Sequence, residues 1–354
     1  MNNQFYQLKV AQLNKPIEEA TTITFEIPDA LKSTFQFKPG QHLIIKFIMN
    51  GEEARRSYSI NSSAISNENL QVTVKRVHKG LVSNYINDSL KEGDTLEVMP
   101  PQGMFCVDIA ADAYKSYFLF AAGSGITPII SIAKSVLAAS PQCYVNLFYG
   151  NKNQDTIIFK DELDQLAKQY ENRFKVVHTL SEPKVWTTWQ QWKGKKGKID
   201  NDAVEWFITN NPPIAQNTEY YICGPNAMNV NIRAKLMELQ IPKNLINIEQ
   251  FGGGNIEEKT NINSVDATAE VVLYGQSHQV NIKAGSTILQ ALKTASINPP
   301  YSCESGICGT CTAKLTKGTA EMKSCMALDD DHLKQGLILT CQALATSPQL
   351  KIEY

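Results

Sequence analysis

The sequence has no apolar segment long enough to cross a membrane and no excess of charge of either sign. Its 354 residues include 34 Lys and Arg against 35 Asp and Glu, which gives a formal net charge of −1. The longest apolar runs, such as residues 117–122, are much shorter than the ~20 residues of a transmembrane helix. We therefore expect neither a membrane protein nor a nucleic-acid-binding protein.

The sequence also lacks the features of a secretory signal peptide. Its first ten residues, MNNQFYQLKV, contain no basic segment followed by an apolar one. We therefore expect a cytoplasmic protein, in which disulfides are rare. The five histidines share no metal-ligand spacing, and we interpret them as structural or surface residues. No internal repeat and no low-complexity tract is present.

Four of the eight cysteines form the most informative pattern in the sequence. Cys303, Cys308 and Cys311 follow the spacing C-x4-C-x2-C, and Cys341 lies about thirty residues downstream. This is the plant-type arrangement for a [2Fe–2S] cluster held by four thiolates. The spacing therefore predicts an iron–sulfur site.

The loop between these cysteines is suited to wrapping around a cluster. Gly306 and Gly309 can adopt positive φ angles and let the backbone approach closely, so amide N–H groups can point at the sulfurs. Two alternatives are left open, disulfides and a zinc site. A zinc ribbon normally pairs two C-x2-C knuckles.

Residues 5–108 have the pattern of short strands separated by turns. The segment 22–28 alternates between apolar and polar residues, and residues 42–48 form an apolar run rich in β-branched residues. Strands at this spacing predict an antiparallel β-barrel, with a helix over residues 81–90.

Two motifs lie inside this predicted barrel. The first is Arg56-Ser57-Tyr58-Ser59, and the second is Gly80-Leu81-Val82-Ser83. In this order they resemble the flavin-binding domain of the ferredoxin–NADP reductase superfamily, whose motifs read R-x-Y-S/T and G-x-x-S/T. The alternative is that an Arg–Tyr pair on a strand simply forms a solvated face.

The resemblance implies that this domain binds FAD. Arg56 would offer its fork of donors to a pyrophosphate, Tyr58 would lie against the isoalloxazine ring, and Ser59 would reach the flavin N5. Ser83 and the adjacent amides would form an anion site at a helix N-terminus. The cofactor-binding residues implied here are Arg56, Ser57, Tyr58, Ser59, Gly80, Val82 and Ser83.

From residue 114 to about 249, strands alternate with helices, which predicts a doubly wound α/β domain. The first strand leads into Gly123-Ser124-Gly125-Ile126-Thr127-Pro128, which lacks the third glycine of the usual dinucleotide motif. About a hundred residues later, a strand ends at Cys223-Gly224-Pro225. Together G-x-G-I-T-P and C-G-P resemble the nicotinamide domain of the same superfamily.

This second resemblance implies NAD(P)H as the electron donor. Gly123, Ser124, Gly125 and Thr127 would cradle its phosphates, with Thr127 also near the flavin. Cys223, Gly224 and Pro225 would line the nicotinamide pocket. Cys223 can also be interpreted as a small buried hydrophobe, and we do not expect it to be a nucleophile.

Three glycines after Phe251 indicate a hinge between two halves of the chain. Phe251 stands where the superfamily often places an aromatic residue over the flavin, although it can also serve only in packing. We predict a flavin domain over 1–110, a nucleotide domain over 111–251, a linker over 252–266 and a ferredoxin domain of the β-grasp type over 267–354.

The whole chain thus resembles superfamily members that carry a C-terminal plant-type ferredoxin domain. These include the reductases of the phenylacetyl-CoA epoxidase system, of 3-ketosteroid 9α-hydroxylase and of the hybrid-cluster protein. The resemblance implies electron transfer from NAD(P)H through FAD and [2Fe–2S] to a redox partner such as a multicomponent oxygenase, with Ser59 and Cys223 in supporting catalytic roles. The alternative is a redox sensor that no longer turns over.

The nucleotide preference depends on a single residue. Lys152 follows the second strand of the α/β domain, where a cation would meet the 2′-phosphate of NADPH. We therefore expect NADPH, with NADH possible if Lys152 is an ordinary surface residue.

Overall fold

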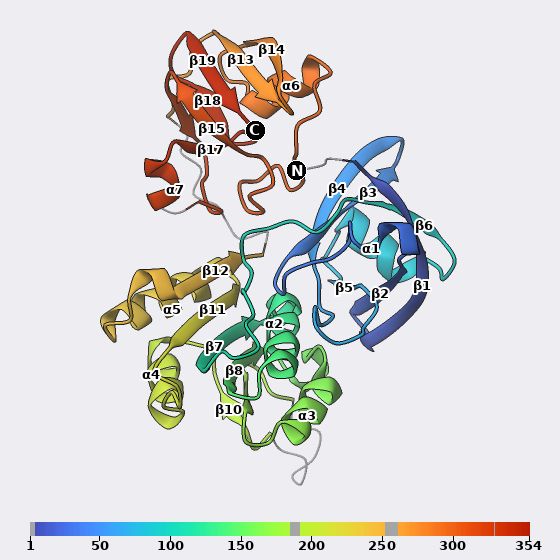
Figure 1. Cartoon of the computed structure of the whole chain (residues 1–354), viewed down its shortest axis with the longest axis vertical. Coiled ribbons are helices and arrows are strands. Elements are labelled where there is room, and N and C mark those ends of the chain that lie inside the picture. The colour runs from blue at the N-terminus through green and yellow to red at the C-terminus, as the bar shows by residue number, and fades with distance from the viewer. Residues whose placement is uncertain (1–3, 185–191, 252–260, 329) are drawn as a thin grey trace. The chain divides into compact units, whose positions relative to one another are not determined.

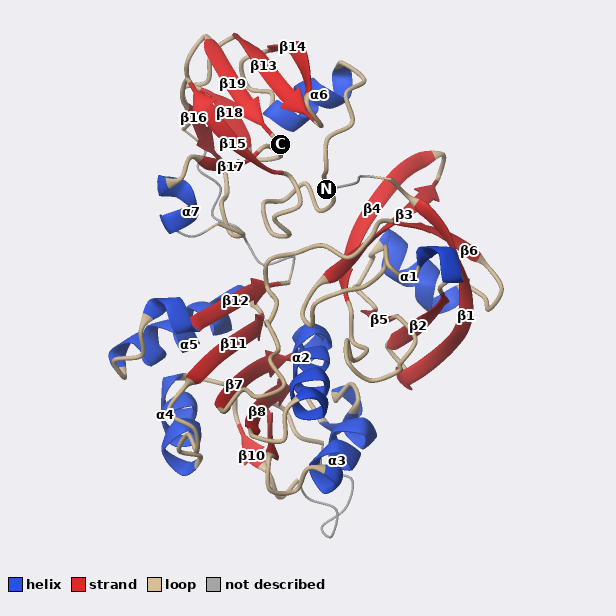
Figure 2. Cartoon of the chain, in the orientation of Figure 1, coloured by secondary structure: helices blue, strands red, loops and turns tan. Residues whose placement is uncertain are grey.

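The computed structural model describes residues 4–184, 192–251, 261–328 and 330–354 (Figures 1 and 2). The chain divides into two compact units. The first unit takes up most of residues 5–251 and contains a β-barrel and an α/β domain. The second unit contains residues 261–354.

Six strands form the sheet of the first domain, in the order β4-β3-β6-β1-β2-β5. Neighbouring strands pair antiparallel. A further antiparallel bridge joins Ile60, directly after β4, to Val72 of β5, so the sheet closes into a barrel. The elements are β1 (Tyr6–Ile17), β2 (Ala20–Glu26), a 3₁₀ turn (Asp29–Leu31), β3 (His42–Met49), β4 (Glu52–Ser59), β5 (Gln71–Lys75), α1 (Leu81–Asp88) and β6 (Thr95–Val98).

Strand β2 shows how the sequence produces this barrel. Ile23 and Phe25 point into the barrel core, and the alternation of a strand turns Thr22 and Thr24 to the other face. Thr22 and Thr24 are nevertheless buried. Both faces of β2 are therefore covered, and the threonine face is available for polar contacts. The prediction of an antiparallel barrel is confirmed.

The α/β domain has six parallel strands in the order β10-β9-β8-β7-β11-β12. Its strands are β7 (Lys115–Ala122), β8 (Cys143–Asn151), β9 (Phe174–Leu180), β10 (Lys195–Lys196), β11 (Thr218–Gly224) and β12 (Ile246–Gln250). Its helices are α2 (Ile126–Ala139), α3 (Lys160–Gln169), α4 (Asn201–Asn210) and α5 (Asn226–Glu238), with 3₁₀ turns at Gly123–Gly125, Gln154–Thr156 and Lys243–Leu245.

Two apolar clusters cover the two faces of this sheet. Helices α2 and α3 pack on one face and α4 and α5 on the other, as expected for a doubly wound domain. The sheet order changes direction beside β7, because its neighbours β8 and β11 lie on opposite sides of it. Ligands bind at such a switch point, outside the carboxyl ends of the strands.

The second unit is a five-stranded sheet, in the order β14-β13-β19-β15-β17, with a separate two-stranded sheet of β16 and β18. Its strands are β13 (Ala267–Leu273), β14 (Gln276–Ile282), β15 (Thr312–Lys317), β16 (Ala320–Met322), β17 (Leu337–Leu339), β18 (Ala343–Ala345) and β19 (Gln349–Glu353). Its helices are α6 (Ile288–Thr294) and α7 (Asp330–Lys334). The sheet and α6 enclose an apolar core. The predicted β-grasp fold is confirmed.

Several element boundaries differ from those that the sequence predicts. The apolar pattern predicts a helix over residues 129–139, but α2 begins at Ile126, because a proline such as Pro128 is tolerated in the first turn. The sequence predicts a helix over residues 286–295 capped by Ser286, but α6 is capped by Thr287, whose hydroxyl accepts a hydrogen bond from Gln290 N. The hairpin turn between β13 and β14 is formed by Tyr274 and Gly275, which both have positive φ angles.

The helices that the sequence predicts in the α/β domain, over residues 129–139, 159–170 and 227–239, do not include α4, although the start of α4 has a readable cap. The Asp200 side chain accepts a hydrogen bond of 2.9 Å from Ala203 N, as an N-cap residue does. The predicted linker 252–266 is described only from residue 261 onward.

Candidate functional site

The glycine turn after β7 lies against the end of β11. A Cβ atom on Gly125 would lie 2.1 Å from the carbonyl oxygen of Cys223, so no residue with a side chain fits there. Because β7 and β11 are neighbouring parallel strands, the contact joins G-S-G and C-G-P at one edge of the sheet. The two motifs of the predicted nicotinamide site therefore meet, although they are far apart in the sequence.

The turn itself is closed by its own side chain. Thr127 is buried, and its hydroxyl donates a hydrogen bond of 3.1 Å to Ser124 O. Since α2 starts at Ile126, the first backbone amides of the helix open toward the turn. Amides at a helix N-terminus bind anions such as a pyrophosphate.

A cation that the sequence pattern did not indicate lies beside this turn. The ammonium of Lys75, on β5 of the barrel, lies 3.8 Å from where a Cβ atom of Gly123 would be. Burial lowers the pKa of Lys75, and nearby Glu19 partly opposes this shift. The Val-Lys-Arg-Val strand pattern did not reveal that this lysine faces the nucleotide domain.

Asn229 fixes the C-G-P turn to the last strand of the sheet. This buried side chain on α5 donates one hydrogen bond of 3.1 Å to Gly224 O and another of 3.1 Å to Glu249 O. Pro225 directly precedes α5 and occupies its N-cap position. The end of β11 is therefore held rigidly beside β12.

Three residues from two domains converge at this edge. Ser59 ends β4 of the barrel, and its hydroxyl donates a hydrogen bond of 3.3 Å to Glu249 Oε2. The thiol of Cys223 lies 4.0 Å from the same oxygen, and Cys223 pairs with Glu249 in the ladder between β11 and β12. The predicted pair Ser59 and Cys223 is thus joined by a carboxyl group that was not predicted.

The electrostatics of this group follow from its burial. Burial raises the pKa of Glu249 to about 8, and the hydrogen bond from Ser59 opposes only part of that shift. Burial also raises the pKa of the Cys223 thiol, and the adjacent Glu249 raises it further. Glu249 is therefore mostly protonated at neutral pH. Cys223 is a thiol rather than a nucleophilic thiolate.

The side chains of the flavin motif on β4 differ in their exposure to solvent. Arg56 is exposed, and its Nη1 donates a hydrogen bond of 2.7 Å to Arg55 O. Ser57 is half-buried, and Tyr58 packs at the edge of the barrel core. The guanidinium of Arg56 is thus accessible to an anionic ligand.

The second flavin motif forms the start of α1. Gly80 is the N-cap residue, and a Cβ atom there would lie 2.5 Å from Ser83 Oγ. The Ser83 hydroxyl accepts from Val77 N, at 3.1 Å, and the Val82 side chain is buried in the barrel core. These positions can therefore meet a phosphate through their backbone amides, whereas the Ser83 hydroxyl already has a partner. Phe251 packs against the core of the α/β domain.

The four predicted cluster ligands lie together in the second unit. Cys303 Sγ accepts hydrogen bonds of 3.4 Å from both Ser305 N and Cys308 N. Gly306 and Gly309 have φ angles of +77° and +70°, so both glycines of the loop adopt the conformation expected of them.

The four thiols form two pairs. The Cys308 thiol donates to Cys303, and with the amide hydrogen bonds this lowers the pKa of Cys303. The Cys311 thiol interacts in the same way with Cys341, whose pKa is lowered. Within the described residues, no three His, Cys, Asp or Glu side chains converge as they would on one metal ion. Two thiol pairs fit the two irons of a [2Fe–2S] cluster, whereas one tetrahedral zinc would need four convergent ligands.

A second loop completes the surroundings of these cysteines. Met326 N and Ala327 N each donate a hydrogen bond of 3.1 Å to Gly306 O, and Gln342 Nε2 donates one of 2.9 Å to Glu304 O. The Ser324 hydroxyl is buried and has no hydrogen-bond partner in the described part of the chain. All eight cysteines are free, so disulfides are not formed.

The fold and these sites define an electron-transfer oxidoreductase with flavin, nicotinamide and iron–sulfur domains. Family models match in the same order, with an oxidoreductase FAD-binding domain over residues 8–106 and an oxidoreductase NAD-binding domain over 119–234. A 2Fe-2S iron–sulfur cluster binding domain matches residues 271–346. The chain belongs to the family of reductase components of multicomponent oxygenases, as the following relatives demonstrate.

Two relatives match over nearly the full length of the chain. A component of the 1,2-phenylacetyl-CoA epoxidase of Escherichia coli is 31% identical over 99% of this chain and 98% of its own length. The ferredoxin reductase component of the 3-ketosteroid-9-alpha-monooxygenase of Rhodococcus rhodochrous is 31% identical over 98% of this chain and 96% of its own.

Solved structures show the same architecture. Phthalate dioxygenase reductase has a TM-score of 0.60 at 26% identity and covers 99% of this chain and 98% of its own. An intact type IV self-sufficient cytochrome P450 monooxygenase has a TM-score of 0.71 at 23% identity. This chain spans only 41% of that protein, and the comparison therefore concerns the fold alone. In the described residues, no helix is long and apolar enough to cross a membrane.

Proposed function

We propose that this chain transfers electrons from NAD(P)H to the oxygenase component of a multicomponent system. Bound FAD would supply the change from the two-electron hydride chemistry of the nicotinamide to the one-electron chemistry of a [2Fe–2S] cluster. The observation that carries the proposal is the convergence of Ser59, Cys223 and Glu249, because it joins the flavin motif of the barrel to the nucleotide motif of the sheet.

On the nucleotide side, the chain's own groups bind and orient the dinucleotide. The amides of Gly123, Ser124, Gly125 and Thr127 hold its pyrophosphate at the start of α2, and the Lys75 ammonium beside Gly123 adds a positive charge. Cys223, Gly224 and Pro225 line the nicotinamide pocket, with Asn229 keeping this turn in place.

On the flavin side, charged, polar and aromatic side chains would bind and orient FAD. Arg56 would bind the pyrophosphate of FAD with its exposed guanidinium, and Ser57 beside it would assist. The backbone amides at the start of α1, those of Val82 and Ser83 after Gly80, would add further donors. Tyr58 would offer its ring to the isoalloxazine, and Phe251 would help to cover it. Ser59 Oγ and Glu249 Oε2 form a path along which a proton can move between the flavin edge and a carboxyl with a pKa of about 8.

Cys303, Cys308, Cys311 and Cys341 hold the [2Fe–2S] cluster, with the amides of Ser305 and Cys308 directed at Cys303 Sγ. Hydrogen bonds to sulfur are one means by which a protein sets a cluster's potential. We place the domain boundaries at 1–110, 111–251, 252–266 and 267–354.

For the nucleotide, we propose a modest preference for NADPH. Lys152 follows β8 and can meet a 2′-phosphate, but its ammonium lies 3.3 Å from the Glu182 carboxylate. A 2′-phosphate must therefore compete with Glu182 for this lysine. NADH would not have to break the ion pair between Lys152 and Glu182, because the Glu182 carboxylate could accept a hydrogen bond from the ribose 2′-hydroxyl.

The partner follows from the relatives, which are reductase components of an epoxidase and of a steroid monooxygenase. We propose that the electrons leave for an oxygenase component of this kind in the cytoplasm. A second candidate, a redox sensor without turnover, would keep the cofactors but would not be reduced by either nucleotide.

Anaerobic stopped-flow absorption tests the proposal. On mixing with NADPH or NADH, the flavin band should bleach and the cluster absorption should then fall. Cofactors that stay oxidised with both nucleotides would leave only the redox sensor.

A further inference from the structure

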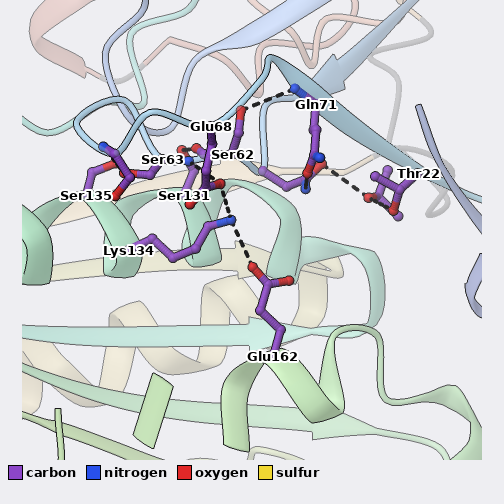
Figure 3. Close-up of polar contacts among 12 residues, drawn as sticks. Thr22, Ser62, Ser63, Glu68, Gln71, Ser131, Lys134, Ser135 and Glu162 are labelled. Carbon is purple, nitrogen blue, oxygen red and sulfur yellow. Dashed lines mark hydrogen bonds and ion pairs between the residues drawn. The ribbon is translucent and has the colours of Figure 1, made fainter. Parts of the chain in front are cut away.

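A buried polar seam joins the barrel to the α/β domain (Figure 3). We use this name for Ser131, Lys134 and Ser135 of α2 together with the loop 61–68 of the barrel. The three α2 residues are spaced i, i+3, i+4, so they share one face of a helix that is otherwise largely apolar. All three are buried.

The charged member of the seam is Lys134. Its ammonium lies 2.8 Å from Glu68 Oε2 in the barrel loop and 2.9 Å from Glu162 Oε1 on α3. The Lys134 side chain is only 7% exposed. The same Glu68 oxygen accepts a hydrogen bond of 3.0 Å from Ser63 N, so the loop is held in the shape that presents this carboxylate.

The two serines add contacts with fixed direction. Ser131 Oγ donates a hydrogen bond of 2.7 Å to Ser62 O, and Ser135 Oγ accepts one of 2.9 Å from Ala64 N. Each pairs a side chain of α2 with the barrel backbone. Because hydrogen bonds need both a distance and an angle, a small slide of α2 along the barrel would break both.

The seam continues into the barrel strands. Ser62 Oγ accepts a hydrogen bond of 3.2 Å from Gln71 N of β5. The neighbouring Asn61 accepts one of 3.1 Å from Thr73 Oγ1, which lies 2.7 Å from Thr22 Oγ1 on β2. The polar threonine face of β2 thus belongs to one connected network that reaches α3.

The position of the seam relates it to the two cofactor motifs. Loop 61–68 begins just after the flavin motif, since Ser59 ends β4, and α2 begins directly after the glycine turn 123–125. Arg173 also holds the far end of α2, donating hydrogen bonds of 2.6 Å to Ser140 O and 3.1 Å to Leu137 O. The seam therefore joins the helix that follows the glycine turn to the loop that follows the flavin motif.

A polar joint of this kind is not the arrangement that favours stability most. Replacing buried ion pairs by apolar residues of similar volume is often neutral or stabilising, whereas buried polar groups can specify a unique arrangement. An apolar face could pack in several registers along a helix. Lys134, Ser131 and Ser135 can meet their partners in the barrel loop in only one position of α2 along the barrel.

We propose that Lys134 is a positioning residue for hydride transfer, which fixes the nicotinamide site relative to the flavin site by locking α2 to the barrel. The inference rests on the proposed function. It assigns Lys134 no contact with substrate or cofactor. A displacement of about 1 Å between reacting atoms can cost about a hundredfold in rate, so a loosened seam should slow hydride transfer more than it weakens nucleotide binding.

The experiment compares Lys134→Met with a matched control, Lys235→Met, in the full-length holoprotein. Lys235 is likewise buried, at 9% exposure, and lies 2.8 Å from Glu205 and 2.9 Å from Glu238, but all three residues lie within the α/β domain. Glu68 and Glu162 are 34% and 38% exposed, so after loss of the lysine they can be hydrated and the variant should fold. Lys134→Arg keeps the charge and serves as the conservative variant.

Stopped-flow bleaching of the flavin is measured over a range of NADPH concentrations. For Lys134→Met we expect the limiting rate to fall about tenfold or more, with less than about a threefold change in the half-saturating concentration. Lys134→Arg should recover most of the rate, and Lys235→Met should stay within about twofold of the wild type.

The outcomes separate the two proposals. A wild-type protein that does not bleach overturns the proposed function. If the wild type bleaches and Lys134→Met, with a full complement of FAD, does so at the same limiting rate, the positioning role is overturned and the proposed function stands. An equal loss in Lys235→Met would likewise overturn it, because the effect would then follow from any buried lysine.

Discussion

The hydroxyl of Ser59 donates a hydrogen bond to Glu249 Oε2 across 3.3 Å, although the two residues lie 190 positions apart in the sequence. Ser59 belongs to the flavin motif, and Glu249 lies beside Cys223 of the nicotinamide motif. This contact ties the two motifs together in space. Because Glu249 lies outside both motifs, it can be replaced without changing either motif.

Replacing Glu249 by Gln should leave flavin reduction by NADPH, a hydride transfer, nearly unchanged and should slow reoxidation of the reduced flavin by about tenfold to a hundredfold, because reoxidation releases a proton that the amide cannot accept through Ser59. The rates of flavin reduction and reoxidation from stopped-flow absorption measure the effect. Glu219→Gln, near the amino end of β11 and so at the opposite edge of the same sheet, is the control. Equal reoxidation rates in Glu249→Gln and the wild type would remove Glu249 from the mechanism.

The pH dependence of the protein's thermal stability should also reflect the raised pKa of Glu249. Its pKa is about 8 in the folded protein and near 4.5 in the unfolded chain, so the folded state keeps a proton that the unfolded state has lost. The stabilisation from this group is complete below pH 4.5 and is lost as the pH rises through 8. The Tm of the wild type should thus fall more between pH 6 and 8.5 than that of Glu249→Gln. Parallel Tm profiles would contradict the raised pKa.

Loss of one predicted cluster ligand should abolish cluster reduction but leave flavin reduction by NADPH intact. Cys341→Ser removes one thiolate of the pair formed with Cys311. We expect the iron content to fall well below about two atoms per chain, while NADPH still bleaches the flavin at close to the wild-type rate. Cys325→Ser, outside the predicted ligand set, should keep both signals. A full cluster in Cys341→Ser would show that this cysteine is not a ligand.

Nucleotide preference should shift in opposite directions at Lys152 and Glu182, whose charged groups are 3.3 Å apart. Glu182→Gln frees the lysine for a 2′-phosphate and should raise the NADPH to NADH ratio of kcat/KM about threefold to tenfold, and Lys152→Gln should lower it by a similar factor. The ratio is measured with ferricyanide as acceptor. If neither variant alters it, the 2′-position is recognised elsewhere.

The conformation of the cysteine loop could be predicted because it is mostly local. Cys303, Cys308 and Cys311 lie in one loop whose glycines adopt positive φ angles, and those constraints are visible in the sequence as C-x4-C-x2-C with Gly306 and Gly309. The same holds for the glycine turn at Gly125, where the structure leaves no room for a Cβ atom. Short-range steric demands restrict residue type and therefore leave a pattern.

Glu249 and Lys75 could not be predicted, because their environment arises only when distant strands meet. Glu249 becomes partly buried because β12 lies beside β11 and because Ser59 of the barrel contacts it. The polar face of α2 was visible in the sequence, but the pairing of Lys134 with Glu68 was not, since Glu68 belongs to another domain. The threonines of β2 likewise looked like an ordinary outer strand face.

The central claim is that one chain carries both a hydride acceptor and a one-electron acceptor that exchange electrons. The most direct measurement is an anaerobic stopped-flow experiment on the holoprotein, with rapid-freeze EPR of the same mixture. The account predicts that NADPH bleaches the flavin first and that the EPR signal of a reduced [2Fe–2S] cluster then appears. A bleached flavin beside a cluster that stays oxidised, with both nucleotides, would contradict it.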